Sequence, residues 1–157
     1  MSHQIDVAAQ AVRVPLARRR VAEIAYGVLR AERARSTRIS ITFVSARSIA
    51  AMNARHLGHA GATDVIAFAF APEQPGGTLI GDIYIAPEIA KANAAQHGNS
   101  SREEVARLVV HGILHVLGYD HPGGRGRLTS PMWRRQEALV ARLTKGRPRR
   151  RLTTHTG

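Results

Sequence analysis

The stretch SSREEVARLVVHGILHVLGYDH (residues 100–121) predicts a long helix followed by a turn. Ser100 and Ser101 each lie three residues before a glutamate, which is the capping-box spacing that begins a helix. The helix is expected to run to about Leu117. Gly118 then occupies the position where helices commonly end in a left-handed residue.

Three of the chain's eight histidines, His111, His115 and His121, lie within eleven residues of this stretch. On a helix, side chains four residues apart project from one face, with Cβ atoms about 5–6 Å apart. Gly118 lets the chain turn back, so that His121 can reach the same point. Three neutral imidazoles would leave a tetrahedral zinc ion one open position for water, whose pKa falls from about 15.7 to about 7. The spacing therefore predicts a metal site of the hydrolytic kind.

Gly112 stands where zinc proteases of the His-Glu-x-x-His pattern carry the glutamate that acts as general base. Glycine cannot take a proton, so the usual route of peptide hydrolysis lacks its base, and a zinc peptidase is disfavoured. Inside a helix, glycine also costs about 1 kcal/mol relative to alanine. Close approach of another element of the fold would offset that cost.

The 157-residue chain has 23 basic and 11 acidic residues, a net charge of +12. This surplus favours a polyanionic partner, most often nucleic acid. A GC-rich genome, which enriches arginine and alanine together, explains it equally well. Residues 145–157 carry five of the basic residues and no acid, so the remainder keeps +7. We expect one domain over residues 1–144, followed by a basic, disordered tail over 145–157.

Several classes of protein are excluded by what the chain lacks. Without cysteine it has no disulfides, thiolate zinc sites or cysteine nucleophiles, so a transition metal would sit on His, Asp or Glu. Its longest apolar stretches are far shorter than a membrane span, and its N-terminus lacks the core of a signal peptide. The cytoplasm is the expected location, with no membrane partner.

Hydrophobic periodicity predicts the remaining elements. The order β–α–β–α–β–β–α–α–α indicates an α+β (mixed α/β) fold, a single mixed β-sheet of about four strands packed with helices. Adjacent strands 63–70 and 79–86 either form a hairpin or are separated in the sheet. The other predicted strands are 5–12 and 38–45; the other helices begin at Pro15, span 45–57, run from Pro87 to about Gln96, and span 131–143 with an inner face of Met132, Trp133, Gln136, Leu139, Val140 and Leu143.

The sequence HGILHVLGYDH (111–121) matches the signature H-G-x-L-H-x-x-G-Y-D-H of the YbeY family of bacterial endoribonucleases and rRNA-maturation factors, which this chain resembles. MNARHLGHAGATDVIAF (52–68) is similar to the family segment L-N-x-x-Y-R-x-x-x-x-P-T-D-V-L-S-F. GDIYIA (81–86) looks like the family's G-D-I/L-x-I strand. The resemblance extends over roughly residues 5–143, and Met132, Gln136 and Glu137 fall on the family's C-terminal helix.

The resemblance implies a zincin-like metal-binding helix and one zinc ion held by His111, His115 and His121, although a three-histidine site also accepts nickel, copper or iron. It implies single-strand-specific endoribonuclease activity, maturation of the 3′ end of 16S rRNA and ribosome quality control. The expected partners are single-stranded RNA, ribosomal RNA of the small subunit and ribosome-associated proteins. The alternative is a ribosome-assembly factor that binds RNA and whose metal is mainly structural.

One departure from the family concerns its Tyr-Arg pair, which falls at His56 and Leu57 here. The family's arginine is proposed to engage the substrate phosphate, and a leucine cannot. Arg55 and His59 are the candidates to restore a cation, because a phosphoryl transition state needs positive charge near its equatorial oxygens. The rival interpretation is that nothing replaces the arginine and that activity is weak.

Two aspartates are further candidates for the site. Asp64 follows Thr63 at the start of a predicted strand, where its carboxylate either accepts an imidazole N–H or caps a local turn. Asp120, beside His121, either orients that ligand or acts as the base that Gly112 does not provide.

Overall fold

The computed structural model describes residues 2–58, 61–120 and 130–145. The predicted ligand His121, the candidate His59 and nearly all of the predicted tail therefore lie outside the described residues. The elements occur in the predicted order: β1 (His3–Ala9), α1 (Arg18–Ala31), β2 (Thr37–Phe43), α2 (Ala46–Leu57), β3 (Val65–Phe70), β4 (Leu79–Ile85), α3 (Pro87–His97), α4 (Ser101–Val116) and α5 (Pro131–Thr144).

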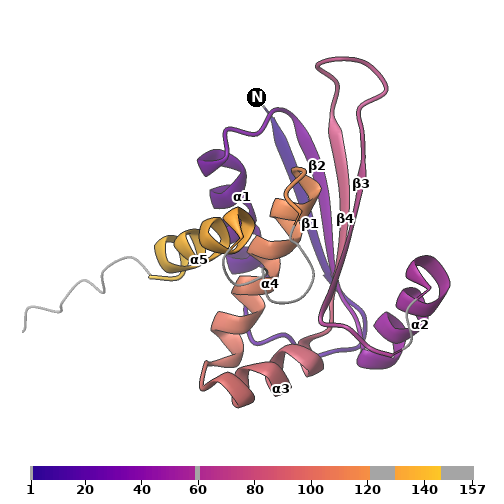
Figure 1. The fold of residues 1–157 in the computed structure, drawn as a ribbon, viewed down its shortest axis with the longest axis vertical. Helices are drawn as coiled ribbons and strands as arrows, with labels where there is room; N and C mark the ends of the chain where they lie inside the picture. The colour runs from indigo at the N-terminus through magenta and orange to yellow at the C-terminus, as the bar shows by residue number, and fades with distance from the viewer. Residues whose placement is uncertain (1, 59–60, 121–129, 146–157) are drawn as a thin grey trace, which may run out of the picture.

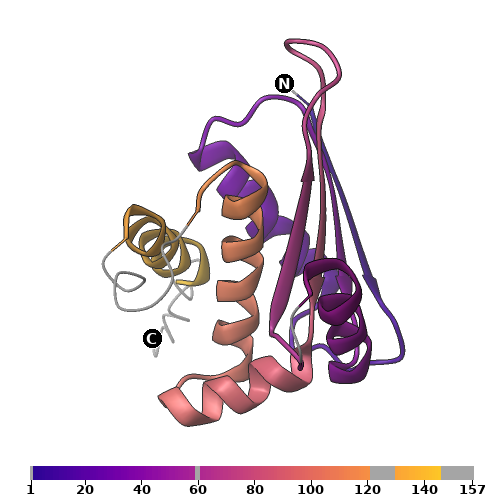
Figure 2. The same ribbon diagram turned by 45° about the vertical axis from the view of Figure 1, so that its right-hand side comes forward.

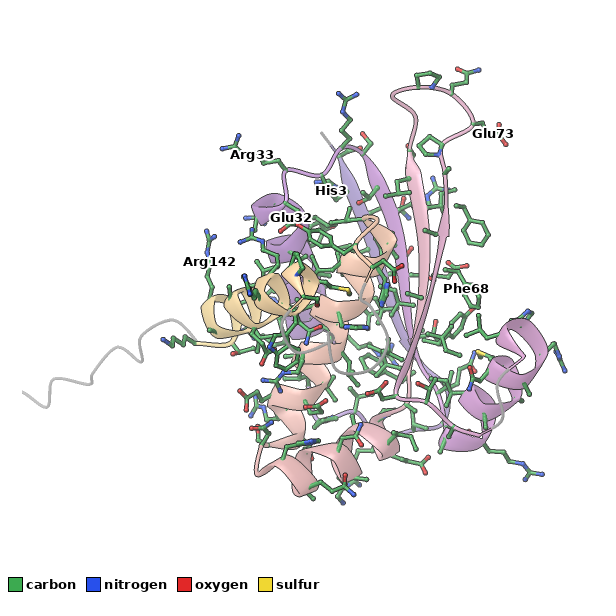
Figure 3. All side chains as sticks on the ribbon, viewed as in Figure 1. His3, Glu32, Arg33, Phe68, Glu73 and Arg142 are labelled. Carbon is green, nitrogen blue, oxygen red and sulfur yellow. The ribbon has the colours of Figure 1, made fainter. Side chains whose placement is uncertain are left out.

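The four strands form one mixed sheet in the order β1-β2-β4-β3 (Figure 1). β1, β2 and β4 run parallel to one another, whereas β3 runs antiparallel to β4. The two strands whose pairing was open therefore form a hairpin, in which Val65 faces Ile85 and Phe70 faces Ile80. Glu73 lies at the hairpin's tip, away from the helices (Figure 3). The predicted α+β class is confirmed.

The two faces of the sheet have different coverings (Figure 2). The alternate side chains of β2 and β4, such as Ile41 and Ile83, are fully buried against α1 and α4, and α5 packs on the outside of that layer. On the opposite face, Phe68 of β3 lies toward α2 (Figure 3), with Ile49 of α2 and Tyr84 in the same smaller cluster. α2 and α4 therefore lie on opposite sides of the sheet.

The central helix α4 begins and ends where its sequence predicts. The Ser100 side chain accepts a hydrogen bond from the Glu103 backbone N–H, and Gly118 has φ +102° just after the helix. A Cβ on Gly112 would stand 2.8 Å from the Ile83 side chain. Gly112 thus allows α4 to lie directly against β4. This close packing offsets the free energy that glycine costs inside a helix relative to alanine.

Two boundaries near the N-terminus differ from prediction. The first strand ends at Ala9, and α1 begins at Arg18 rather than at Pro15. Ala17 has an extended backbone, with φ −63° and ψ 145°, so Pro15 lies in the connection between strand and helix. Leu16, also in that connection, is buried in the core and anchors it there. In the part of the chain that the structure describes, no helix has the length and apolarity needed to cross a bilayer.

Candidate functional site

α4 presents His111 and His115 side by side near its C-terminal end. Their ring centroids are 4.5 Å apart and the ring planes meet at 76°. Both side chains are half-buried, whereas Gly112, Ile113 and Leu114 between them are buried toward the sheet. The helix therefore uses one face for packing and presents two imidazoles on the other, as the four-residue spacing requires.

The third predicted ligand, His121, falls in the undescribed segment, so the three-histidine set stays a prediction. Over residues 2–58, 61–120 and 130–145, no three His, Cys, Asp or Glu side chains gather as a metal-ligand set. The two described imidazoles suit a borderline-soft ion such as zinc in both donor type and proximity.

α5 contributes a contact to the first of these histidines that sequence reasoning did not anticipate. Nδ1 of His111 lies 2.6 Å from Oε1 of Gln136, and Gln136 is 4% exposed. Because this contact engages Nδ1, Nε2 is the His111 ring nitrogen that a metal would take. Gln136 was predicted only as part of the inner face of the last helix.

Gln136 also contacts a cluster of charged side chains through Glu137. The cluster is centred on Arg107, which lies one helical turn before His111. The Nε of Arg107 donates to both carboxylate oxygens of Glu137, at 3.2 and 3.0 Å, and its Nη1 donates to Glu104 at 3.1 Å. Burial favours the neutral form of Arg107, but hydrogen bonds and charges from Glu137 and Glu104 outweigh it and raise its pKa. The guanidinium thus stays charged and ties α4 to α5.

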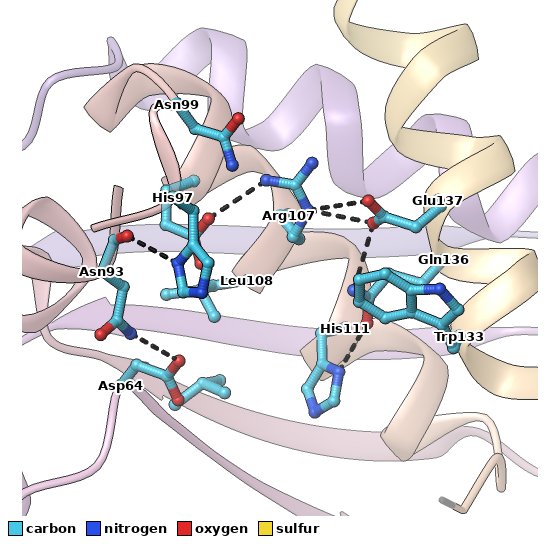
Figure 4. A pocket seen from close by; sticks show the side chains of 12 residues that line it. Asp64, Asn93, His97, Asn99, Arg107, Leu108, His111, Trp133, Gln136 and Glu137 are labelled. Carbon is cyan, nitrogen blue, oxygen red and sulfur yellow. Dashed lines mark hydrogen bonds and ion pairs between the residues drawn. The ribbon is translucent and has the colours of Figure 1, made fainter. Parts of the chain in front are cut away.

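A pocket of about 390 Å³ lies beside His111, between α3, α4 and α5 (Figure 4). It contains three carboxylates and one guanidinium, which makes it a poor place for a phosphate and a better one for a neutral group. The lining residues are Asp64, Val65, Asn93, His97, Asn99, Glu104, Arg107, Leu108, His111, Trp133, Gln136 and Glu137.

Trp133 corrects one sequence prediction. It was placed on the inner face of the last helix with Met132, but only Met132 is buried, at 1% exposure. Trp133 is half-buried, and its ring stands at the pocket beside His111 and Gln136 (Figure 4). Position 133 lies in the first turn of α5, where its side chain lines the pocket together with Gln136 and Glu137.

Asp64 lies at the same pocket as His111, just before β3. Its carboxylate accepts hydrogen bonds from Asn93 Nδ2 at 3.3 Å and from the Thr63 hydroxyl at 3.5 Å, and its backbone carbonyl accepts from the Ala86 N–H. These contacts hold the loop before β3 to α3. The position at the pocket favours a site role, the local bonds favour a structural one, and the role stays a prediction.

Of the two candidate cations, Arg55 lies within the described residues and His59 does not. Arg55 is exposed on α2, on the other side of the sheet from α4, and is not among the pocket's lining residues. His59 lies outside the described residues. Leu57, which stands at the position of the family's arginine, is 45% exposed, and His56 packs edge-on against Phe68 at 5.9 Å.

Asp120 is exposed just after α4, and the residue before it is anchored. The Tyr119 hydroxyl donates to Glu32, the C-cap residue of α1, at 2.7 Å, and Glu32 also pairs with Arg135 of α5. The hydrogen bond to Glu32, with some burial, raises the pKa of Tyr119 above 10.0. The turn that leads to His121 is therefore attached to two helices.

Sequence reasoning missed Gln136, Arg107 and Tyr119 as contributors to this region. A polar residue on an otherwise apolar helix face was the available signal for Gln136, because a buried amide needs partners. Arg107 lies four residues before His111, so the two were predictably on one face of the helix. Nothing in the sequence marks Tyr119 as a partner of Glu32.

A solved structure shares the fold. The solution structure of TM1509 from Thermotoga maritima has a TM-score of 0.59 and 24% sequence identity to this chain, over 89% of each chain. Among proteins of similar sequence is Endoribonuclease YbeY from Parafrankia sp., which is 36% identical over 66% of this chain and 70% of its own. Endoribonuclease YbeY from Thermobifida fusca is 36% identical over 74% of this chain and 80% of its own.

The family described as Endoribonuclease YbeY matches residues 4–144, which include all of the sheet except its first residue, His3, and both helices of the site. The chain belongs to this family. Membership supports endoribonuclease activity and therefore an RNA substrate.

Proposed function

We propose that this protein is a metal-dependent endoribonuclease that cleaves single-stranded RNA, with one zinc ion held by His111, His115 and His121. We further propose that it acts in maturing the 3′ end of 16S rRNA and in ribosome quality control, and that its partners are the small ribosomal subunit and ribosome-associated proteins in the cytoplasm. The observation that carries the proposal is the pair of adjacent imidazoles on α4, beside a pocket, in a chain of an endoribonuclease family.

The described residues fit the proposed ion. His111 and His115 offer nitrogen donors one helical turn apart, and Gln136 engages Nδ1 of His111, so that Nε2 is the donor. Zinc bound there supplies Lewis-acid chemistry, since it polarises a phosphoryl group and activates water for hydrolysis. Asp64 and Asp120 are the carboxylates proposed to orient a ligand or to accept a proton.

The pocket supports the preference for single strands. Its volume of about 390 Å³ is in the range of small-ligand sites. The half-buried Trp133 ring offers a flat apolar surface on which a base can stack. A base inside a duplex is stacked on both sides and cannot enter without being flipped out, whereas an unpaired one can. The phosphate then lies toward the histidines, away from the pocket's carboxylates.

Charge supports an RNA substrate bound largely through its backbone. The surplus of basic residues that gives the chain its net charge of +12 lies outside this pocket, whose lining holds three carboxylates and one guanidinium. Phosphate contacts from the arginine-rich surface would make affinity fall steeply as salt is raised. Either Arg55 or His59 is proposed to take part of the role of the family's arginine. If Arg55→Ala and His59→Ala both left RNA cleavage unchanged, neither residue would replace the family's arginine.

The test compares zinc-loaded protein, chelated protein and the variant His115→Ala on single-stranded RNA, on precursor 16S rRNA and on casein. We expect RNA cleavage only by the loaded wild type. The matched control is His3→Ala, a histidine on the edge strand β1, which should retain cleavage. Cleavage that survives both chelation and His115→Ala would reject the proposal. RNA binding without cleavage would favour the assembly-factor alternative, and casein cleavage would favour a peptidase.

A further inference from the structure

Gln136 is a buried polar side chain in an apolar surrounding. It is 4% exposed, and its neighbours on the inner face of α5, Met132, Leu139 and Val140, are all buried and apolar. Burying an amide without hydrogen bonds is unfavourable, so a leucine would pack here more favourably unless the amide had partners. It has two, His111 on one side and Glu137 on the other.

These two partners determine which way the amide points. Nε2 of Gln136 donates to Oε2 of Glu137 at 3.4 Å, and a carboxylate can only accept, so the amide nitrogen belongs on that side. The amide oxygen therefore faces His111, at 2.6 Å from Nδ1. An amide oxygen can only accept as well. The proton of the neutral imidazole must then be on Nδ1, which places the lone pair on Nε2.

Glu137 is held in place in its turn. Arg107 approaches both of its carboxylate oxygens, at 3.2 and 3.0 Å, with 15% of the arginine side chain exposed. Arg107 and His111 lie one turn apart on α4, and Gln136 and Glu137 are adjacent on α5. The four residues are thus joined by a chain of hydrogen bonds across the α4–α5 interface, from Arg107 through Glu137 and Gln136 to His111 (Figure 4).

The direction of the hydrogen bonds matters for a metal ligand. The carboxylate of Glu137 draws the Gln136 N–H toward itself and makes the amide oxygen a stronger acceptor. A stronger acceptor at Nδ1 makes Nε2 a better electron donor and holds the ring in one orientation. The arrangement is the kind that supports ligating histidines in metal sites, with a glutamine between the imidazole and the carboxylate.

We propose that Gln136 is a positioning residue that fixes His111 in the Nδ1–H tautomer with Nε2 presented for metal, and that the Arg107–Glu137 pair orients Gln136. The proposal rests on the metal site of the proposed function but concerns a state of the metal-free protein. A tautomer can be observed whether or not RNA is cleaved, so the two proposals fail separately.

The experiment reads the tautomer of each histidine by two-dimensional ¹H–¹⁵N correlation through two-bond couplings, in metal-free protein at pH 8, above the ordinary histidine pKa of about 6.5. Wild type is compared with Gln136→Leu, which removes the acceptor, and Gln136→Glu, which keeps it. The matched control is Gln96→Leu, the same substitution at an exposed site on α3. Zinc affinity is measured on all four by competition with a chromophoric chelator.

We expect His111 to be the Nδ1–H tautomer in wild type, Gln136→Glu and Gln96→Leu, and a mixture in Gln136→Leu. Zinc affinity should fall about 10- to 100-fold in Gln136→Leu, the usual effect of losing such a support, and should stay near wild type in Gln96→Leu. An Nε2–H tautomer in the wild type would overturn the proposal, and this single spectrum decides even if a variant fails to fold. An unchanged tautomer in folded Gln136→Leu would overturn it too.

Discussion

Gly81→Ala is the substitution that tests most directly how the histidine helix is held on the sheet. Gly81 is buried in β4, opposite the last turn of α4. Its nearest neighbour there is Val116, the residue that follows His115. A Cβ placed on it would stand 2.6 and 2.7 Å from the two methyl groups of Val116 and 3.1 Å from Cδ1 of Ile39. Contacts below 3.0 Å require movement, and a valine cannot turn both methyls away at once.

The size of the effect follows from two opposing contributions. Overpacking in a well-packed core costs about 1–3 kcal/mol. Replacing a strand glycine by alanine returns about 0.5–1 kcal/mol of backbone entropy. We therefore expect Gly81→Ala to lower the free energy of unfolding by about 1–2 kcal/mol. Val116→Ala, which removes two methyls from a side chain that is 3% exposed, should cost about 2 kcal/mol.

The double variant separates this contact from any general weakening of the fold. In Gly81→Ala with Val116→Ala, the new Cβ occupies space that the methyls vacate, so the loss should be no greater than that of Val116→Ala alone. Urea unfolding, followed by the fluorescence of the single tryptophan, Trp133, gives all three values. Strictly additive losses, about 3–4 kcal/mol in the double variant, would refute the packing argument.

Three further outcomes are expected. Tyr119→Phe should lower stability by about 1 kcal/mol at pH 8. Because the hydrogen bond to Glu32 raises the pKa of Tyr119, its contribution is present below about pH 10 and lost as pH rises through the folded pKa. The gap between wild type and variant in urea unfolding should therefore narrow at pH 11, and a constant gap would contradict this. Trp133→Ala should raise KM for single-stranded RNA about 5- to 150-fold, with Trp133→Phe near wild type, because stacking is worth about 1–3 kcal/mol per base. Equal KM values in Trp133→Ala and wild type would exclude the base-stacking role. Deleting residues 146–157 should flatten the dependence of RNA affinity on salt without abolishing cleavage, as measured by filter binding across a salt series, and an unchanged slope would show that the tail makes no phosphate contacts.

Much of the fold could be predicted because its elements follow simple periodicities. Ile39, Ile41 and Phe43 alternate along β2 and are all buried, and the caps of α4 at Ser100 and Gly118 are where the sequence places them. The pairing of β3 with β4 could not be decided, because both a hairpin and a crossover satisfy the same apolar pattern. The observed sheet order decides for the hairpin, because β3 and β4 are neighbours and run antiparallel.

The site was predictable only where it is local in sequence. The spacing of His111 and His115 alone places their rings together, because both are on one helix. The contact of His111 with Gln136 joins residues 25 positions apart on different helices, and no periodicity specifies how α5 is rotated against α4. The same rotation turns Trp133 from the core toward the pocket. The roles of Asp64, Asp120, Arg55 and His59 remain predictions.

We propose that this endoribonuclease acts through one metal ion held by His111 and His115 of α4 and by His121. A titration of metal-free protein with zinc, with single-turnover cleavage of a single-stranded RNA followed at each point, tests it most directly. We expect the cleavage rate of the wild type to rise to a plateau at one zinc per chain, and His115→Ala to stay at the metal-free rate throughout. Full cleavage by the wild type before any zinc is added, with a chelator present, would contradict it.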